Sequence, residues 1–117
     1  MNPDEKAKRL RIYISSTDKF RHTPLYEVII YAARRYGISG ATVFKGIMGY
    51  GASSEIHSNK LWEITEKLPV VVEIIDDSDK IDSFFESIRP YFDKIGKGHI
   101  ITSEVISVIL HKTGTRR

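Results

Sequence analysis

Hydrophobic residues alternate with polar ones near the start of the chain and then change to a helical spacing. The alternation predicts a strand over residues 8–16. The helical spacing that follows predicts a helix over 24–36, with Thr23 as its N-cap and Pro24 at its first position, where the fixed φ of proline suits a helix. Gly37 supplies the stop signal for this helix. The polar stretch between the two elements predicts a solvated loop.

Three further strands are expected from β-branched and apolar runs, over residues 40–48, 69–75 and 99–111. The small and polar segment 49–60 between the first two of them has no apolar period and predicts a loop that is mobile without a ligand. Residues 61–67 fit a helical turn and a strand equally well. The last strand is followed by a polar tail.

A second helix is expected after Asp76-Asp77-Ser78-Asp79, with apolar residues at helical spacing as far as Ile95. The acids suit the positive end of a helix dipole and predict N-terminal capping, while a hard-cation site is the less simple explanation. Pro90 lies inside the pattern and is expected to kink the helix or to begin a new turn. The segment Gly96-Lys97-Gly98 ends the element.

The order βαββαβ predicts an α+β fold. The expected architecture is a ferredoxin-like sandwich, an antiparallel four-stranded sheet with two helices on one face. One domain over 1–117 is expected, with frayed ends at 1–7 and 115–117. Both alternating faces of 70–75 and 105–110 are apolar, yet two helices can cover only one face. A second copy of the chain is therefore expected to bury the other face.

The composition narrows the classes of function. The chain is 41% hydrophobic with a formal net charge of +3, which excludes a disordered chain. It contains no Cys, which excludes disulfide scaffolds, thiol catalysis, iron–sulfur clusters and thiolate zinc sites and fits a cytoplasmic protein. The four histidines lack metal-ligand spacing, so no metal is expected. No apolar run is long enough to insert into a membrane.

Two glycine-bearing segments carry the candidate binding chemistry. Glycines allow close backbone approach, and N–H groups, hydroxyls and lysines bind phosphate oxygens. The candidates are Lys45, Gly46, Gly49, Gly51, Ser53 and Ser54 in the first segment, and Lys94, Gly96, Lys97, Gly98 and His99 in the second. The spacing matches neither a Walker motif nor a dinucleotide fingerprint. Each segment taken alone also fits an ordinary turn.

Taken together with the element order, these segments resemble the PII signal-transduction family over about residues 9–114. Thr42-Val43-Phe44-Lys45-Gly46 resembles the strand that leads into the T-loop of that family, and Val71-Val72-Glu73-Ile74-Ile75-Asp76-Asp77 its third strand. Lys94-Ile95-Gly96-Lys97-Gly98-His99-Ile100 is similar to the B-loop, and Lys112-Thr113-Gly114 to the C-terminal motif. The segment 49–57 resembles a PII-like family of unknown function whose members are often encoded beside fluoride-channel genes.

The resemblance implies a non-enzymatic regulator without catalytic residues. It implies a homotrimer that binds an adenine nucleotide, ADP or ATP, in clefts between subunits. The resemblance also implies that Tyr50, at the T-loop base, and Lys112 belong to the candidate nucleotide-binding residues. The loop at about 50–60 would signal to a target protein, with a membrane channel or transporter as a candidate target.

Several positions depart from the PII pattern. Lys97 and His99 stand where the B-loop usually has Asp and Lys, and Leu110 replaces one C-terminal arginine. The glutamine near the T-loop base and the T-loop tyrosine that some relatives modify are missing, with Ser58 near the latter point. Sensing of 2-oxoglutarate and nitrogen signalling are therefore not expected.

Two other functions share this element order. An RNA-binding module would carry base-stacking aromatics on its third strand, but residues 70–75 contain none, so no nucleic acid is expected as a partner. A small enzyme such as an acyl phosphatase would need an Arg in a glycine-rich loop after the first strand. The segment 17–22 has Arg21 but no glycine.

Overall fold

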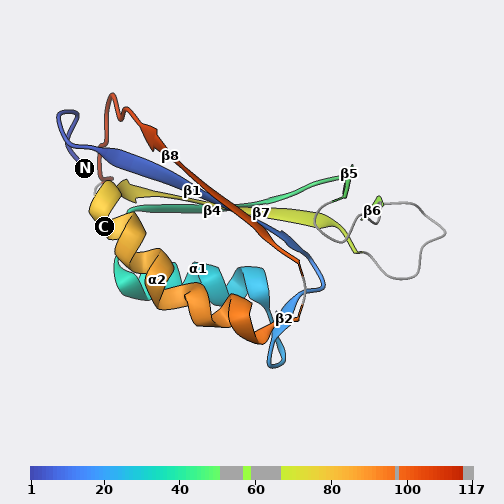
Figure 1. The fold of residues 1–117 in the computed structure, drawn as a ribbon. Helices are drawn as coiled ribbons and strands as arrows, with labels where there is room; N and C mark the ends of the chain where they lie inside the picture. Colours follow the sequence, from blue (N-terminus) through green and yellow to red (C-terminus); the bar gives the residue numbers. More distant parts are fainter. Residues whose placement is uncertain (51–56, 59–66, 97, 115–117) are drawn as a thin grey trace.

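The computed structural model describes residues 1–50, 57–58, 67–96 and 98–114. Its elements in chain order are β1 (Ala7–Ser15), β2 (Lys19–Phe20), β3 (Thr23–Pro24), α1 (Leu25–Tyr36), β4 (Gly40–Lys45), β5 (Met48–Gly49), β6 (His57–Ser58), β7 (Pro69–Asp77), α2 (Ser78–Lys94) and β8 (Ile100–Ile106). The main sheet has the order β4-β7-β1-β8, and every neighbouring pair is antiparallel. Both helices lie on one face of this sheet (Figure 1). The ferredoxin-like α+β sandwich expected from the sequence is confirmed.

The core lies between the sheet and the two helices. Alternate residues of β1 and β7 point toward the helices, and the apolar stripes of α1 and α2 cover them. The largest fully buried side chains are Phe84, Ile12, Leu25, Ile29, Ile74, Ile81, Ile88, Val70 and Val72. They fix the position of the sheet relative to the helices, and so the position of the loops at each sheet end.

The segment between β1 and α1 differs from the expected solvated loop. Residues 19–24 form the short hairpin of β2 and β3, in which Phe20 pairs with Thr23. The helix begins at Leu25, so the prediction of Thr23 as N-cap and Pro24 as the first helical residue is wrong. Strand pairing keeps both residues extended. The predicted stop is confirmed, because Gly37 has a φ of 88° and its N–H bonds back to α1.

The strand expected over 40–48 is interrupted. β4 ends at Lys45, and a separate two-residue ladder then joins β5 to β6. Residues 57–58 thus form a strand within the segment predicted to be a loop, and the prediction is wrong at this point. The rest of the loop expected over 49–60, at 51–56 and 59–60, lies outside the described residues, as does most of the ambiguous stretch 61–67.

The acids before α2 act differently from the expected cap. The residue at the N-cap position, Asp77, makes no side-chain capping bond. Asp76 is buried instead, and its carboxylate accepts N–H bonds from Ser39 at 2.9 Å and from Asp77 at 2.6 Å. The carboxylate therefore ties the start of α2 to the loop after α1. The helix continues through Pro90 and ends at Lys94.

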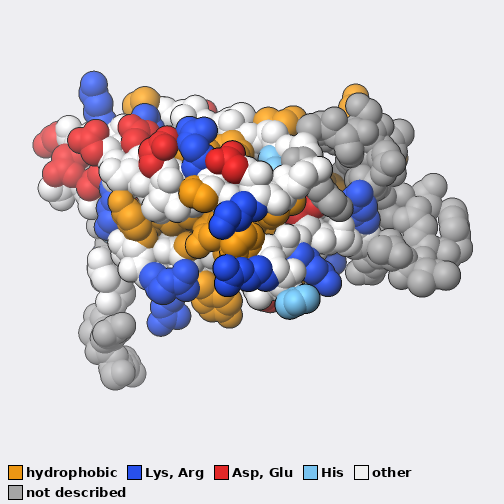
Figure 2. Space-filling model, turned by 60° about the horizontal axis from the view of Figure 1, so that its bottom comes forward, with side chains coloured by type: hydrophobic (Ala, Val, Ile, Leu, Met, Phe, Trp, Pro, Cys, Tyr) orange, Lys and Arg blue, Asp and Glu red, His pale blue; other side chains and the backbone are white. Residues whose placement is uncertain are grey.

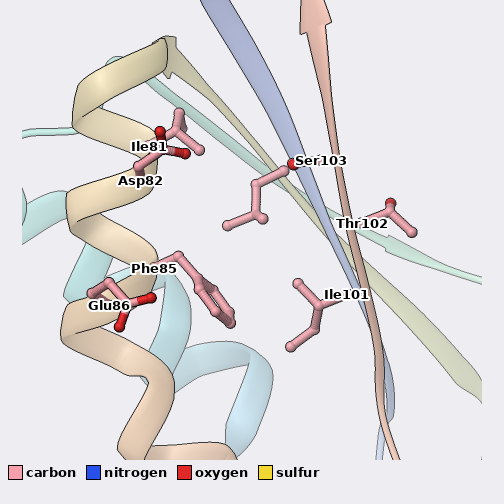
Figure 3. Close-up of a pocket in the computed structure, with 8 residues that line it drawn as sticks. Ile81, Asp82, Phe85, Glu86, Ile101, Thr102 and Ser103 are labelled. Carbon is pink, nitrogen blue, oxygen red and sulfur yellow. The ribbon is translucent and has the colours of Figure 1, made fainter.

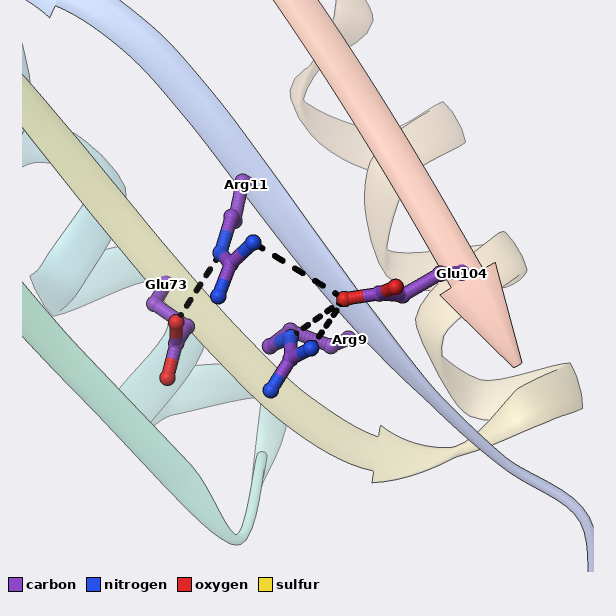
Figure 4. A network of polar contacts seen from close by, with 4 residues as sticks. All are labelled: Arg9, Arg11, Glu73 and Glu104. Carbon is purple, nitrogen blue, oxygen red and sulfur yellow. Dashed lines mark hydrogen bonds and ion pairs between the residues drawn. The ribbon is translucent and has the colours of Figure 1, made fainter. Parts of the chain in front are cut away.

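The sheet face away from the helices is mixed and not apolar throughout. An ion-pair network of Arg9, Arg11, Glu73 and Glu104 crosses β7, β1 and β8 (Figure 4). The Glu73 hydrogen bond raises the pKa of Arg11 above its ordinary value. The expectation of a contiguous apolar face is thus wrong over this part of the sheet, because Glu73 lies within 70–75 and β1 adds the charged alternate residues Arg9 and Arg11.

One apolar row nevertheless crosses the whole free face. Phe44 pairs with Val71, Val71 with Tyr13, and Tyr13 with Ile100, so that one residue of each strand contributes. Phe44 is 52% exposed and Ile100 47% exposed. The apolar surface that could meet a second copy is concentrated in this row.

The last strand is shorter than expected. β8 ends at Ile106, and residues 107–114 are irregular, so the prediction of a strand to residue 111 is wrong. Ile109 and Leu110 are consequently exposed in this segment. None of the helices within the described ranges is long and apolar enough to cross a membrane.

Candidate functional site

The first glycine segment leaves the sheet at the end of β4. Lys45, the last residue of β4, is exposed, and Tyr50 after β5 is 72% exposed. Gly49 pairs with His57 in the small ladder that forms the base of the following loop. Gly51, Ser53 and Ser54, which the sequence also nominates, lie outside the described residues.

Pro69 lies so close to Gly46 and Gly49 that it leaves little room for a side chain at either position. A Cβ built on Gly46 would lie 2.8 Å from Pro69 Cγ, and one built on Gly49 would lie 3.3 Å from the same atom. The N–H of Gly46 donates to the carbonyl of Pro69 at 2.7 Å. The backbone of this segment is therefore held against the start of β7. Gly46 cannot also donate this N–H to a phosphate unless the bond to Pro69 opens.

The second glycine segment joins α2 to β8. Lys94 is the last residue of α2, and Gly96 and Gly98 after it are exposed. Nothing lies within 4 Å of a Cβ built on Gly96, so the chain itself does not require glycine there. Lys97 lies outside the described residues. The N–H of Ile95 donates to the carbonyl of Phe92 at 3.3 Å.

His99 turns away from the solvent. Its side chain is 6% exposed, and Nε2 lies 3.4 Å from Oδ2 of Asp18. Asp18 itself is buried, which the expected solvated loop over 17–22 did not anticipate. A lone Asp in a polar stretch gives no sequence signal of burial, because its partner lies far along the chain.

The two segments lie at the same end of the sheet but at opposite edges. Lys45 pairs with Val70 on β7, and on the other edge Tyr13 of β1 pairs with Ile100. Two strands separate β4 from β8, which corresponds to about 14 Å between their axes. A single chain therefore does not bring the two segments together.

Lys112 lies beyond the other end of β8. The strand carries the chain away from Gly98 toward the opposite end of the sheet (Figure 1). Seven strand residues span about 23 Å. Lys112 is exposed in the irregular segment that follows, so it is separate from both glycine segments within one chain.

The hairpin of β2 and β3 adds cations beside the second glycine segment. The Phe20 ring has Arg21 Cζ at 5.4 Å and Lys94 Nζ at 5.8 Å from its centroid. Arg21 has a φ of 60°, a left-handed conformation that a non-glycine residue rarely adopts. Sequence reasoning took this stretch for a solvated loop and did not include Arg21 among the binding residues.

A separate groove runs between α2 and β8, with a volume of about 340 Å³ (Figure 3). Phe85 and Ile101 point toward one another across its apolar part, and Asp82 and Glu86 lie on the helical side. Figure 2 shows the helical layer from outside, with lysines and arginines around a central hydrophobic area and acids gathered toward one end. None of the residues that the sequence nominated lines the groove.

The positions of three groups of residues concern the two alternative functions, an RNA-binding module and an acyl phosphatase. β7 presents Val71, Glu73 and Ile75 to the free face, so the third strand of the expected order carries no aromatic residue. Arg11 is engaged by Glu73, which reduces its availability to a phosphate backbone. Arg21 occupies a hairpin rather than the glycine-rich loop of an acyl phosphatase.

Comparison with known proteins identifies the family. The sequence profile of the DUF190 family, which is described as an uncharacterised ACR, matches residues 7–108. This chain belongs to the DUF190 family. A UPF0166 protein of Aquifex aeolicus is 43% identical to it over 105 residues, which is 89% of this chain and 94% of the relative. A UPF0166 protein of Methanocaldococcus jannaschii is 40% identical over 66% of this chain and 70% of the relative.

Solved structures show that this DUF190 protein has the fold of PII-like proteins. A putative PII-like signalling protein from Thermus thermophilus superposes with a TM-score of 0.63 at 17% identity, over 90% of this chain and 91% of the other. CPII, a nitrogen regulatory PII-like protein from Thiomonas intermedia, superposes with a TM-score of 0.59 at 15% identity, over 88% and 90%. That structure of CPII is bound to ADP, AMP and bicarbonate.

Proposed function

We propose that this protein is a non-enzymatic PII-like regulator that binds ADP or ATP between the subunits of a homotrimer. The observation that carries the proposal is the placement of the two glycine segments at one end of the sheet, on opposite edges. Each edge by itself offers half of a binding site. The fold shared with CPII, whose structure contains ADP and AMP, supports the same ligand class.

The sheet geometry supports a site that two copies complete. β4 and β8 form the two open edges of the sheet, and β8 runs antiparallel to β4. When β8 of one copy lies beside β4 of the next, the antiparallel alternation continues. The start of β8 then lies near the end of β4. Such a head-to-tail contact closes into a ring and places Gly96 and Gly98 of one copy near Lys45 and Gly49 of another.

The charges of the proposed site come from lysines. Lys45 and Lys94 flank the glycines, and Lys97 lies between Gly96 and Gly98 in the sequence. Gly96 and Gly98 are exposed, and backbone N–H groups of such residues suit phosphate oxygens. Lys112 would join from a further copy, because the six residues 107–112 after β8 can extend about 20 Å. We propose that the loop at about 50–60 relays ligand binding to a target protein in the cytoplasm, a membrane channel or transporter being the candidate class.

The proposal is tested by calorimetric titration of the protein with ADP and ATP and by native mass spectrometry of the assembly. Binding at micromolar concentrations by a trimer is the expected result. Absence of binding below millimolar nucleotide overturns the proposal. Hydrolysis of acyl phosphate at an enzymatic rate would instead favour the small-enzyme alternative.

Removal of Lys112 tests how far the site extends. Lys112→Ala is expected to weaken ADP binding by ten- to a hundredfold, because a charge-assisted bond contributes about 1.5–3 kcal/mol. Arg35→Ala is the matched control, since it removes an exposed cation from α1. Equal affinities of the Lys112 variant and the control would remove Lys112 from the proposed site.

A further inference from the structure

A buried pair of ionisable side chains lies beneath the second glycine segment. The His99 side chain is 6% exposed and that of Asp18 3% exposed, and their closest atoms, Nε2 and Oδ2, are 3.4 Å apart. The His99 ring packs edge-to-face with the ring of Phe92, with the centroids 5.3 Å apart. Polar side chains buried this deeply are retained at a cost in stability unless they pair.

Each side chain of the pair has one polar atom that could still form a hydrogen bond. Nε2 of His99 and Oδ1 of Asp18 are buried without a hydrogen-bond partner in the described part of the chain. Oδ2 of Asp18 accepts the N–H of Ser15 at 2.9 Å. A small movement of the ring would let its N–H donate to the carboxylate, and Nε2 has no other hydrogen-bond partner within the described part of the chain.

Backbone hydrogen bonds hold Asp18 in place, whereas Gly96 has few neighbours. The N–H of Asp18 donates to Ser15 at 3.1 Å, and its carbonyl accepts the N–H of Leu25 at 2.7 Å. Gly96 in contrast has open space around its Cβ position. His99 is the residue directly after the turn whose side chain reaches a fixed part of the protein.

We propose that the His99–Asp18 pair is a positioning contact that fixes the chain directly after Gly98, so that the N–H groups of Gly96 and Gly98 are held ready to bind phosphate. This inference rests on the proposed function and names the contact that pre-organises its site. A turn that is already ordered binds a ligand without the entropic cost of ordering it. His99 thus acts through the backbone of the turn and does not touch the ligand, which agrees with its inward side chain.

Two substitutions of His99 separate positioning from packing. His99→Leu keeps an apolar side chain in the site but removes the N–H donor, whereas His99→Gln keeps a donor. We expect His99→Leu to weaken ADP binding about tenfold in calorimetry and His99→Gln to stay within about threefold of the wild type. His22→Ala is the matched control, because His22 is exposed on the neighbouring hairpin, and it is expected to bind as the wild type does.

A double-mutant cycle tests whether the carboxylate of Asp18 acts together with His99. Asp18→Asn keeps the size of the side chain and an acceptor for Ser15, but removes the charge. If the two residues act as a pair, the double variant Asp18→Asn/His99→Leu binds ADP no more weakly than His99→Leu alone. Additive losses in the double variant would contradict a shared contact. Thermal melts of each variant confirm that it is folded.

A ligand-free measurement keeps the inference separate from the proposed function. In NMR spectra without nucleotide, the amide signals of Gly96 and Gly98 are expected to shift or broaden in His99→Leu and to stay near the wild-type positions in His99→Gln. If the wild type binds no ADP, the proposed function fails, and these two signals alone decide whether the pair holds the turn. Unchanged glycine signals in His99→Leu, or equal ADP affinities of the Leu and Gln variants, would overturn the inference.

Discussion

At the scale of single residues, glycines that look alike in the sequence have different environments. Gly46 is enclosed by Pro69, and its N–H is already bonded. Gly96 faces open space and has no positive φ. The sequence nominated both for close approach to a phosphate, but for Gly46 the close approach in this structure is to another part of the same chain.

Substitution of the two glycines is therefore expected to separate stability from binding. Gly46→Ala should lower the free energy of unfolding by about 1–3 kcal/mol, because its Cβ would press on the Pro69 ring. Gly96→Val should change it by less than about 0.5 kcal/mol. If phosphate approaches the turn, Gly96→Val loses ADP affinity all the same. Urea denaturation and calorimetry measure the two effects, and a Gly46→Ala protein of wild-type stability would contradict the steric argument.

At the scale of elements, the junction of α1, β4 and α2 depends on Asp76. Lys80 on α2 donates to the carbonyl of Gly37 at 2.6 Å and lies 3.6 Å from Asp76. Burial alone would raise the pKa of Asp76, but the N–H donors of Asp77 and Ser39, together with Lys80, outweigh burial and hold this pKa below its ordinary value. The charged form of Asp76 is thus the form that the fold prefers.

This preference predicts a pH-dependent contribution to stability. Because the folded pKa is lowered, the contribution is present above about pH 4, the pKa of an unfolded Asp, and is lost as the pH falls through the folded pKa. Asp76→Asn should cost about 1–3 kcal/mol at pH 7, and this difference from the wild type should shrink below pH 3. Chemical denaturation at both pH values provides the measurement.

The control for this prediction is Asp79→Asn, which changes an exposed acid in the first turn of α2. It is expected to have a small effect at either pH. A difference between Asp76→Asn and the wild type that stays the same at low pH would show that shape rather than charge ties the junction together.

At the scale of the whole molecule, the free face of the sheet combines a charged network with one apolar row. The network of Arg9, Arg11, Glu73 and Glu104 is satisfied within the chain. Exposed ion pairs of this kind add little stability and remain hydrated. A second copy is therefore expected to meet the apolar row, which lies at the sheet end that carries both glycine segments.

A charge placed in this row should dissociate the assembly. Phe44→Glu is expected to yield monomers in light scattering at concentrations at which the wild type is assembled, because a carboxylate buried without a partner costs several kcal/mol. Tyr31→Glu, at an aromatic residue of similar exposure on α1, should leave the mass unchanged. An assembled Phe44→Glu protein would exclude this row from the interface.

Local sequence signals were sufficient for much of the fold. Alternation in β1, the valine run of β7 and the Gly37 stop each depend on neighbouring residues, so the sequence predicts them well. Thr23-Pro24 has the pattern of a helix start, but pairing with β2 keeps it extended. Apolar residues 107–111 have the pattern of a strand, but no neighbouring strand pairs with them beyond Ile106.

The sequence by itself determined the order of the four main strands and two helices and the positions of the two glycine segments along the chain, because hydrophobic period and motif spacing are local properties. Its motifs also resemble those of the PII family. Only the tertiary structure decided that the two segments lie at one sheet end on opposite edges, that Pro69 holds Gly46, and that His99 turns inward to Asp18. These three facts depend on strand order and on contacts between residues far apart in the chain. A pattern along the sequence contains no information on which distant side chain will be the partner.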